Sequence, residues 1–556
     1  MKQKVKEITQ KALNKLCEAE DVSVDIMGLP KFDISRTKDA KFGDFATNIA
    51  LVLSKELKVK PRELAQKIID LMPKDSGIID KYEIAGPGFI NFFLSPEVWR
   101  RNLDSIHDQK EKYGSSSELN GPRVLVEFVS ANPTGPLHVG HGRGAAVGDS
   151  LARLLRATGF RVDSEYYVND VGNQMNILGR SLYYRYRELQ GDDVQFPENH
   201  YQGQYMKEMA IEFADSAEAN RIKGLQESEA VPIASAYACK KILEGIKDDL
   251  GVFGVTYDRY FSERELHESG RLVQALDELK RLGKAEQRDG ALWFFMEDSQ
   301  DEKDRVLVRA TGEPTYFAAD VAYHNDKMNR GYDLLVDVWG SDHHGYVPRV
   351  KAAIDAFGHS SDKLRVLLVQ FVNLVRQGQK ISMSTRSGEF ITLREVLEEV
   401  GSDAARFFFL TKRCDSHLDF DLDLAKKQSS DNPVYYVQYA HARISSIFRI
   451  AQEKGIDADI SNPDLSALNL PEELILMKKL ADFPNVLREA SEALEPHRVT
   501  FYLMELSELF HSYYHDNKIL GEDNRVKKAR LYLVEAVRLV ISNGLTILGV
   551  SAPDRM

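Results

Sequence analysis

The chain has 556 residues, of which 43% are hydrophobic and 28% charged, and its formal net charge is −12. This length exceeds what one hydrophobic core can hold, so we expect several globular domains. The acidic balance argues against general affinity for DNA, although a local basic stripe can still bind RNA. No uninterrupted apolar run approaches the ~18 residues of a membrane span. The three cysteines form no CxxC pair, which argues against disulfides or a cysteine zinc site and favours a cytoplasmic protein.

We predict a small α+β domain over residues 1–112. Apolar residues recur at helical spacing in 1–20, which has no apolar core of a signal peptide, and again in 44–72. The segment "YEIAGPGFINFFL" is typical of strands. The polar segment "KYGSSSELNGP" that follows has the composition of a linker.

Residues 113–400 predict an α/β domain. The strand "RVLVEFV", the helix "GAAVGDSLARLLRATG" and the strand "FRVDSEYYVND" form a βαβ unit, which favours a doubly wound, Rossmann-like parallel sheet. Residues from about 185 to 285 predict a helical insertion between two halves of this sheet. The second half is expected from the strands "ALWFFM", "RVLVRA", "YDLLVDVWG" and "RVLLVQFVNLV". Residues 401–556 keep apolar residues at three-and-four spacing, which predicts an all-α helical bundle.

The segment "NPTGPLHVGHGRG" lies where the first strand of this sheet turns into a helix. Ligands of doubly wound sheets bind beyond the carboxyl ends of strands, where a helix N-terminus offers unpaired N–H groups. His138 and His141 face the same way on the first helical turn, so both can donate hydrogen bonds to phosphates. Gly140 lets the backbone approach a nucleotide closely.

Two other interpretations of this segment stay open. In the first, the histidines are surface residues of a tight turn. In the second, Gly142, Gly144 and Gly148, with Asp163 at the next strand, form a dinucleotide-binding fingerprint, and the protein is an NAD-dependent oxidoreductase. The glycine spacing is GxGxxxG instead of GxGxxG, so the fingerprint is imperfect.

A polar loop after the second half-sheet, "QGQKISMSTRSGEF", favours a nucleoside triphosphate over NAD. Lys380 and Arg386 in a mobile loop can close on a diphosphate leaving group, for which an NAD enzyme has no use. Alone, such a loop is most often a solvated turn. Together, the histidine motif and the loop resemble the "HIGH" and "KMSKS" signatures of class I aminoacyl-tRNA synthetases, here "HVGH" (138–141) and "SMSTR" (382–386).

Over nearly its whole length the chain resembles the arginyl-tRNA synthetases within this class. The resemblance is carried by "VEFVSANPTGPLHVGH", "YYVNDVGNQ", "TYFAADVAYH", "VWGSDHHGY", "LDFDLDLAKKQSSDNPVYYVQYAHAR" and "LGVSAPDRM". It implies ATP-dependent attachment of L-arginine to tRNA(Arg) through an arginyl-adenylate, with release of AMP and diphosphate and with Mg²⁺ bound by the ATP. It also implies an appended tRNA-binding domain at 1–112, the catalytic domain at 113–400 and an anticodon-binding domain at 401–556. A monomer is the default expectation.

The resemblance assigns roles in ATP binding. His138 and His141 would stabilise the phosphates during catalysis, and Gly140 would admit the adenine. Gly340 and Asp342 of "WGSDHHG" would hold the ribose and adenine.

The loop departs from the family pattern at one position. Its first signature lysine is Ser382 here, and we take Lys380, two residues earlier, as the catalytic substitute. Met383 would contact ATP, and Ser384 and Arg386 would act in catalysis.

A guanidinium group requires planar acceptors, because its fixed N–H donors pair best with carboxylates and amide oxygens. The resemblance implies an arginine pocket made by Glu127, Asn132, Tyr316, Asp320 and His343. The spacing of four puts Tyr316 and Asp320 on one helical face; without the resemblance, they would be taken as a core aromatic and a surface carboxylate. His343 and His344 point apart on an extended segment, so we expect no protein-bound metal.

Two further groups of residues are assigned to tRNA by the resemblance. In "GPGFINFF", Phe89 would stack on a splayed base and Asn91 would hydrogen-bond its edge; the alternative is an ordinary strand with a buried Phe89. In the bundle, an aromatic and basic stripe would bind the anticodon loop, although aromatics at helical spacing are more often core; it comprises Tyr435, Tyr439 and Arg443.

Overall fold

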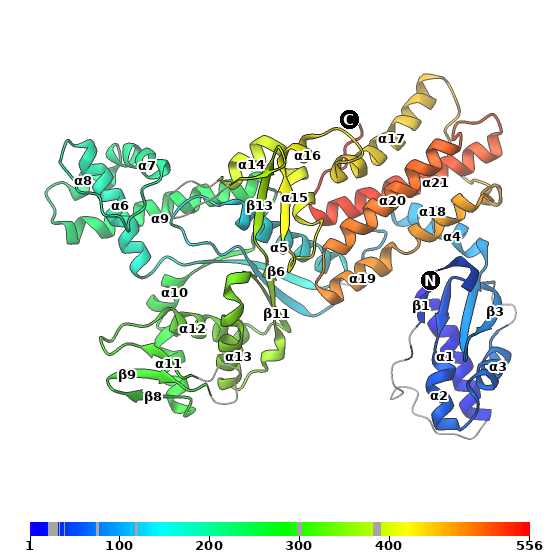
Figure 1. Ribbon diagram of the computed structural model, residues 1–556, viewed down its shortest axis with the longest axis horizontal. Helices are drawn as coiled ribbons and strands as arrows, with labels where there is room; N and C mark the ends of the chain where they lie inside the picture. Colours follow the sequence, from blue (N-terminus) through cyan, green and yellow to red (C-terminus); the bar gives the residue numbers. More distant parts are fainter. Residues whose placement is uncertain are drawn as a thin grey trace.

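The computed structural model describes residues 1–19, 32, 34–37, 39–73, 77–116, 120–296, 303–381 and 391–556. Its N-terminal part is an α+β domain that projects below the helical bundle (Figure 1). An antiparallel sheet of order β1-β2-β4-β3 forms this domain together with three helices. The elements are α1 (Lys2–Ala19), β1 (Ile34–Arg36), β2 (Phe45–Thr47), α2 (Ile49–Leu57), α3 (Pro61–Leu71), β3 (Ile79–Ala85) and β4 (Phe89–Leu94).

A helix, α4 (Pro96–Gln109), connects this domain to the rest of the protein. Its apolar face buries Trp99, Leu103 and Ile106. His107 stacks on Tyr532 of the bundle with ring centroids 3.6 Å apart. The connection is therefore a packed helix that rests on the bundle.

The central sheet is parallel and doubly wound, as predicted. Its order is β12-β11-β5-β6-β7, so the chain starts in the middle, adds β6 and β7 on one side and returns to add β11 and β12 on the other. The strands are β5 (Arg123–Phe128), β6 (Arg161–Val168), β7 (Arg259–Ser262), β11 (Leu334–Gly340) and β12 (Leu364–Val369). The helices packed near it are α5 (Val139–Ala157), α10 (Glu263–Glu268), α11 (Arg271–Arg281), α12 (Tyr316–Asn329) and α13 (Val347–Ala356).

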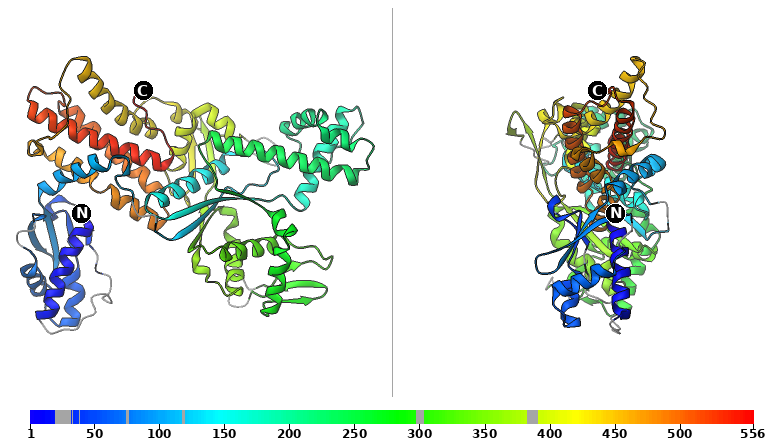
Figure 2. Two further views of the ribbon diagram at one scale, coloured as in Figure 1. Left: turned by 180° about the vertical axis from the view of Figure 1, so that it is seen from behind. Right: turned by 90° about the vertical axis from the view of Figure 1, so that its right-hand side faces the viewer.

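The insertion differs from its predicted limits. It is helical from α6 to α9 and forms a separate lobe in Figure 1 and in the left view of Figure 2. Residues 259–262, however, form β7 at the edge of the central sheet, so the helical part ends earlier than predicted. Its helices are α6 (Asn173–Leu189), α7 (Gln204–Ala214), α8 (Ala217–Ile222) and α9 (Glu227–Val252).

Two strands assigned to the second half-sheet lie elsewhere. The segments "ALWFFM" and "RVLVRA" belong to a small antiparallel sheet of order β10-β9-β8, because a tight turn at Asp289 and Gly290, both at positive φ, folds β8 back on β9. The strands are β8 (Ala285–Arg288), β9 (Ala291–Phe294) and β10 (Arg305–Val308). Only β11 and β12 complete the central sheet.

A third small sheet follows the central one. Strand β13 pairs with β14 and, in parallel, with β15. This group consists of β13 (Val372–Arg376), β14 (Gln379–Lys380), α14 (Leu393–Val400), α15 (Ser402–Phe409), β15 (Leu418–Asp421) and α16 (Leu422–Lys426).

The remaining chain is the predicted helical bundle, made by α17 (Pro433–Glu453), α18 (Pro471–Leu480), α19 (Phe483–Ala493), α20 (His497–Asp516) and α21 (Asn524–Leu548). Among the described residues, α21 is the one helix that is long and apolar enough to span a membrane. However, 72% of its apolar stretch is buried inside the protein, as in a core helix. The carbonyl of Leu548 at its end accepts hydrogen bonds from Arg406 Nε at 2.9 Å and from Ser150 Oγ on α5 at 3.2 Å. The buried Arg406 also pairs with Asp149 of α5. The bundle therefore anchors α5 directly.

Candidate active site

A cavity of about 390 Å³ lies where β5 and β11 reach their carboxyl ends. Both strands are followed by segments that return over the sheet edge, which is where doubly wound folds bind ligands. Six residues from three separate segments, predicted to bind arginine or, for Gly340, ATP, come together on the cavity wall: Glu127, Asn132, Tyr316, Asp320, Gly340 and His343.

The Glu127 carboxylate on the cavity wall is paired with neighbouring side chains. Its carboxylate accepts a hydrogen bond from Ser130 Oγ at 2.9 Å and forms a buried ion pair with Lys327. Lys327 also donates to Asp337 at 2.8 Å. Although burial opposes it, the pKa of Lys327 is raised by Asp337 and Glu127, so this lysine stays charged beneath the site.

Asp320 lies one turn after Tyr316 on α12, as the spacing predicted. Its carboxylate accepts a hydrogen bond from the Tyr346 hydroxyl at 2.8 Å. Burial raises the pKa of Asp320. Tyr316 is 48% exposed and begins the helix, so its ring lies at the mouth of the cavity and not in the core.

A third carboxylate, Glu263, lines the cavity and was not predicted from the sequence. Burial and the neighbouring carboxylates Asp320 and Asp170 raise its pKa to about 7. Glu263 directly follows β7, the strand that went unrecognised. Recognition of β7 as a strand of the parallel sheet would have placed Glu263 at its carboxyl end.

The two histidines form the first turn of α5. Gly140 N donates to His138 Nδ1 at 3.1 Å, and His138 N donates to His141 Nδ1 at 3.2 Å. The rings stack with centroids 3.7 Å apart. Because both Nδ1 atoms accept backbone hydrogen bonds, both Nε2 atoms carry the ring protons and remain donors. Burial lowers the pKa of His138 and lowers that of His141 to about 3, so both rings are neutral at physiological pH.

The chain that follows the predicted loop returns to this corner. Leu393 N donates to Leu137 O at 2.7 Å, and Thr392 forms a β-bridge with His138. The loop residues Met383, Ser384 and Arg386 lie outside the described residues. One end of the loop is therefore fixed beside the histidines.

Lys380, the candidate for the missing signature lysine, lies on β14, directly before the loop. It is mostly exposed and lies 3.1 Å from Asp419 of β15. It is not among the residues that line the cavity.

Gly340 ends β11, and a Cβ there would lie 2.5 Å from Asp342 Oδ1, so a larger residue would require the Asp342 side chain to move. Asp342 itself is mostly exposed and outside the cavity wall.

Two glycines of the alternative fingerprint, Gly142 and Gly148, have a packing role, whereas Gly144 faces open space. Gly148 lies in the middle of α5, and a Cβ there would lie 2.2 Å from Cγ of Phe128, within the helix–strand contact. A cofactor turn would instead place its glycines between strand and helix.

The residues assigned to tRNA lie in two places far from the cavity. In the N-terminal domain, Phe89 is 39% exposed, whereas Asn91 is only 3% exposed and so offers little to a base edge in this conformation. In the bundle, Tyr435 stacks with Tyr439 at 5.7 Å, and the Tyr439 hydroxyl accepts a hydrogen bond from Arg443 at 2.9 Å.

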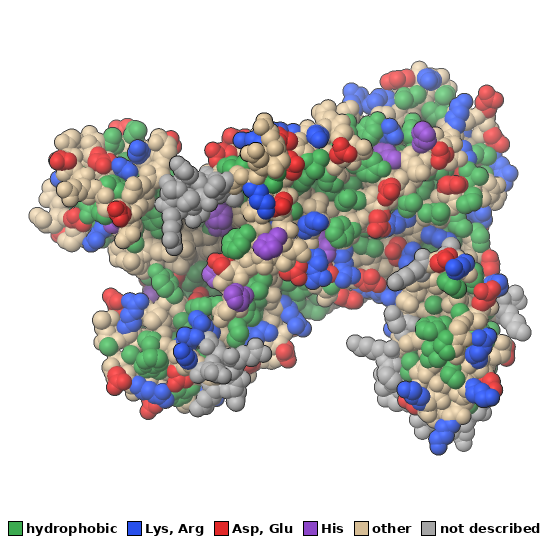
Figure 3. Space-filling view, viewed as in Figure 1, with side chains coloured by type: hydrophobic (Ala, Val, Ile, Leu, Met, Phe, Trp, Pro, Cys, Tyr) green, Lys and Arg blue, Asp and Glu red, His purple; other side chains and the backbone are tan. Residues whose placement is uncertain are grey.

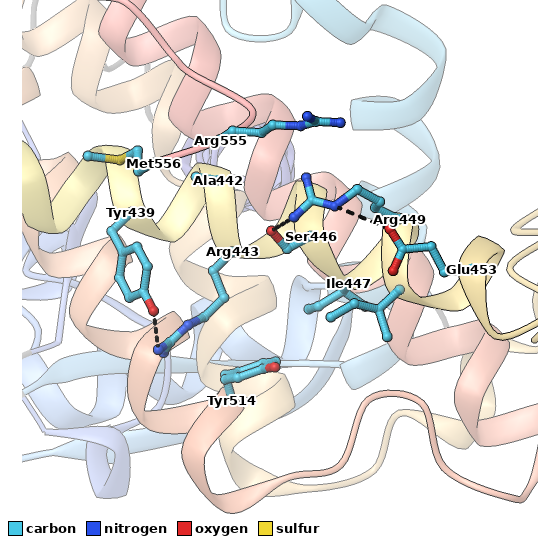
Figure 4. Close-up of a pocket in the computed structure, with 11 residues that line it drawn as sticks. Tyr439, Ala442, Arg443, Ser446, Ile447, Arg449, Glu453, Tyr514, Arg555 and Met556 are labelled. Atoms are coloured by element: carbon cyan, nitrogen blue, oxygen red, sulfur yellow. Dashed lines mark hydrogen bonds and ion pairs between the residues drawn. The ribbon is translucent and has the colours of Figure 1, made fainter.

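Tyr439 and Arg443 line a second cavity, of about 630 Å³. Figure 4 shows that its other basic side chains are Arg449 of α17 and Arg555 at the end of the chain. Over the face seen in Figure 3, by contrast, acidic and basic side chains are interspersed. Among the side chains that line this cavity, three arginines stand beside one acid, Glu453, so the excess of basic side chains there is local.

Residues 102–419 match the family model described as tRNA synthetases class I (R), catalytic domain. With the parallel sheet and the histidine corner, this match defines a class I aminoacyl-tRNA synthetase. Residues 3–94 match the arginyl tRNA synthetase N terminal domain, and residues 437–556 match the DALR anticodon binding domain. The chain belongs to the arginyl-tRNA synthetase family.

Individual relatives agree with the family models. The arginine–tRNA ligase of Desulfosudis oleivorans is 53% identical over 530 residues, 95% of each chain. That of Syntrophotalea carbinolica is 49% identical over 557 residues, the whole of both chains. The arginyl-tRNA synthetase structure from Thermus thermophilus shares the fold over both full chains, with a TM-score of 0.79 at 23% identity. None of these supports the NAD-dependent oxidoreductase.

Proposed function

We propose that this chain activates L-arginine with ATP and transfers it to tRNA(Arg). The observation that supports this most directly is an acidic cavity beside the histidine corner, both at the carboxyl ends of parallel strands. The carboxylates suit a guanidinium group, and the corner offers N–H donors to a triphosphate.

In the first step, an oxygen of the arginine carboxylate attacks the α-phosphorus of ATP, and diphosphate leaves with the electrons of the broken P–O bond. His138 and His141 donate from Nε2 to phosphate oxygens as negative charge moves onto the leaving group. In the second step, a ribose hydroxyl of tRNA attacks the arginyl carbonyl carbon and AMP leaves. The protein forms no covalent bond, so positioning and charge stabilisation carry the catalysis.

ATP is held along the same edge of the sheet. Gly140 admits the adenine, and Gly340 and Asp342 hold the nucleoside. Mg²⁺ is bound mainly by the phosphates and adds charge neutralisation.

The loop closes over the phosphates from the side of Thr392, whose bridge to His138 supports this placement. Met383 contacts the nucleotide, and Ser384 and Arg386 act on the leaving group. Lys380 takes the role of the signature lysine. To do so, it leaves its ion pair with Asp419 and pairs with the diphosphate.

Arginine is recognised by two sets of acceptors. Asp320 and Glu263 accept hydrogen bonds from the guanidinium beside the Tyr316 ring. Asn132 and Glu127 lie at the end of β5 and bind the α-amino group of arginine. Lys327 holds the Glu127 carboxylate in place. His343 closes the opposite wall. Lysine cannot satisfy the paired acceptors and is rejected, because a buried carboxylate without a partner is costly.

The tRNA contacts the protein at both ends of the molecule. Phe89, with Asn91 in the same strand, reads a base in the N-terminal domain. Tyr435, Tyr439 and Arg443 bind the anticodon loop at the second cavity, where stacking and local positive charge combine. The protein acts as a cytoplasmic monomer.

Charging of total tRNA with labelled amino acids tests the function. We expect ATP-dependent incorporation of arginine, with lysine at least about 1000-fold less efficient. Charging with another amino acid, or none with arginine, would overturn the proposal.

A further inference from the structure

The segment between β5 and α5 holds a strained backbone. Val129 and Ser130 adopt φ of 67° and 42°, although neither is glycine. A β-branched residue rarely enters this region, and such conformations persist only where the surroundings enforce them. Contacts from neighbouring parts of the fold must therefore hold this segment in place.

Three tyrosine hydroxyls hold this segment at every third carbonyl. Tyr257 donates to Phe128 O at 3.1 Å, and Tyr166 donates to Ala131 O at 2.9 Å. The third, Tyr205, donates to Thr134 O at 2.7 Å. Side-chain hydroxyls thus satisfy the carbonyls of Ala131 and Thr134 outside regular structure, and add to the hydrogen bond that Phe128 O accepts from Ser130 N at 3.0 Å.

The three tyrosines come from different parts of the fold. Tyr166 lies on β6 and Tyr257 just before β7, and their rings touch edge to face at 5.4 Å within the core of the catalytic domain. Tyr205 lies on α7, in the helical insertion. The Thr134 side chain is also hydrogen-bonded to Tyr201, which precedes α7. Among the described residues, the insertion therefore hydrogen-bonds this segment around Thr134.

The held segment carries groups of both substrate sites. Ser130 Oγ donates to Glu127 and accepts from Tyr167 N at 3.1 Å, and Asn132 lines the cavity. His138 follows four residues after Thr134. A shift of the Thr134 carbonyl would displace the amino-acid wall and the phosphate corner together.

We propose that Tyr205 is a positioning residue through which the helical insertion sets the geometry of both substrate sites. Tyr166 and Tyr257 fix the start of the segment from the core, and Tyr205 fixes its end from the insertion. Activation of arginine therefore depends on the docking of α7. This inference rests on the roles proposed above for Asn132 and His138.

Tyr205→Phe removes only the hydroxyl and keeps the ring. We expect arginine kcat/KM in aminoacylation to fall about tenfold, the usual effect of one lost buried hydrogen bond, through both a lower kcat and a higher arginine KM. The KM for tRNA(Arg) should stay at its wild-type value. The matched control is Tyr184→Phe, which removes a hydroxyl within the insertion that bonds Glu227 at 3.0 Å, and it should retain wild-type kinetics.

A second substitution tests the contact from the other side. A methyl group in Gly135→Ala would lie 3.3 Å from the Tyr205 hydroxyl oxygen and press on it. Gly135→Ala should therefore lower arginine kcat/KM clearly in the wild type and much less in Tyr205→Phe, where that oxygen is absent.

The inference is wrong if Tyr205→Phe matches the Tyr184→Phe control, if only its KM for tRNA changes, or if Gly135→Ala costs the same factor in both backgrounds. Each of these results leaves the function intact, since the wild-type enzyme still charges tRNA with arginine. Loss of arginine charging in the wild type itself would instead contradict the proposed function.

Discussion

Lowering the pH from 8 to 6 is expected to raise the KM for arginine about tenfold. The Glu263 carboxyl must be ionised to accept a guanidinium, but burial and the carboxylates Asp320 and Asp170 raise its pKa to about 7. Below that pH the substrate must displace a proton before it binds. The KM for ATP should change much less, because the pKa of His141 is lowered to about 3, so its ring gains no proton in this range, and burial also lowers the pKa of His138.

The magnitude follows from the titration of one group. With a pKa of about 7, the ionised fraction falls from about 0.9 at pH 8 to about 0.1 at pH 6, a ratio of about ten. Glu263→Gln removes this dependence and raises the KM at pH 8 by about 10- to 100-fold, because an amide replaces a buried charged acceptor.

The assay is steady-state aminoacylation at saturating ATP and tRNA(Arg) from pH 6 to 8, with the arginine KM measured for both proteins. Glu263→Gln should show a nearly flat profile. A variant that keeps the wild-type slope would refute the assignment of this titration to Glu263, and a wild-type KM that is constant over the range would refute the raised pKa.

Three further substitutions give distinct expected results. His141→Asn should lower the kcat of arginine activation, measured by diphosphate exchange with tRNA(Arg) present, by about 100-fold with little change in arginine KM, since a donor to the leaving group is lost. Lys327→Met should lower the free energy of unfolding by about 3–5 kcal/mol in urea, because Glu127 and Asp337 lose their buried counter-ion. Arg443→Ala should raise the KM for tRNA(Arg) about tenfold and leave the arginine KM unchanged.

For each of these three predictions, one result would contradict the reasoning. A raised arginine KM in His141→Asn would assign the ring to the amino-acid pocket. Unfolding of Lys327→Met at the wild-type urea midpoint would show that the lysine is not needed to compensate the two acids. Arg525→Ala serves as the control for Arg443, since Arg525 pairs with Asp464 away from the second cavity; equal effects of both would indicate only general charge.

The central sheet could be predicted because its inner strands are buried on both faces and appear as continuous apolar runs. Strand β7 was missed for the opposite reason, since "RYFS" is a short edge strand with a single fully buried residue, Phe261. The segments "ALWFFM" and "RVLVRA" have the composition of strands, but composition does not specify pairing partners. The turn at Asp289 and Gly290 decides their pairing, and it favours a local hairpin over the distant sheet.

The site residues likewise divide into those that the sequence could reveal and those that only tertiary pairing brings to the cavity. Tyr316 and Asp320 were predicted from the family resemblance, and helical spacing explains why they lie on one face of α12. The same periodicity continues to His324 and Lys327, one and two turns further along α12, and it could have revealed the buried ion pairs. Glu263 could not be found in this way, because only the tertiary pairing of β7 with β6 brings it to the cavity.

The anchoring of α5 by the Leu548 carbonyl has a consequence for synthesis of the protein. Helix α5, which presents both histidines, leaves the ribosome long before α21, whose last turn supplies that carbonyl and whose side chains cover α5. A nascent or truncated chain without α21 lacks this support for the helix that carries both histidines. We therefore expect activation of arginine to begin only when the translated chain also carries the helical C-terminal domain.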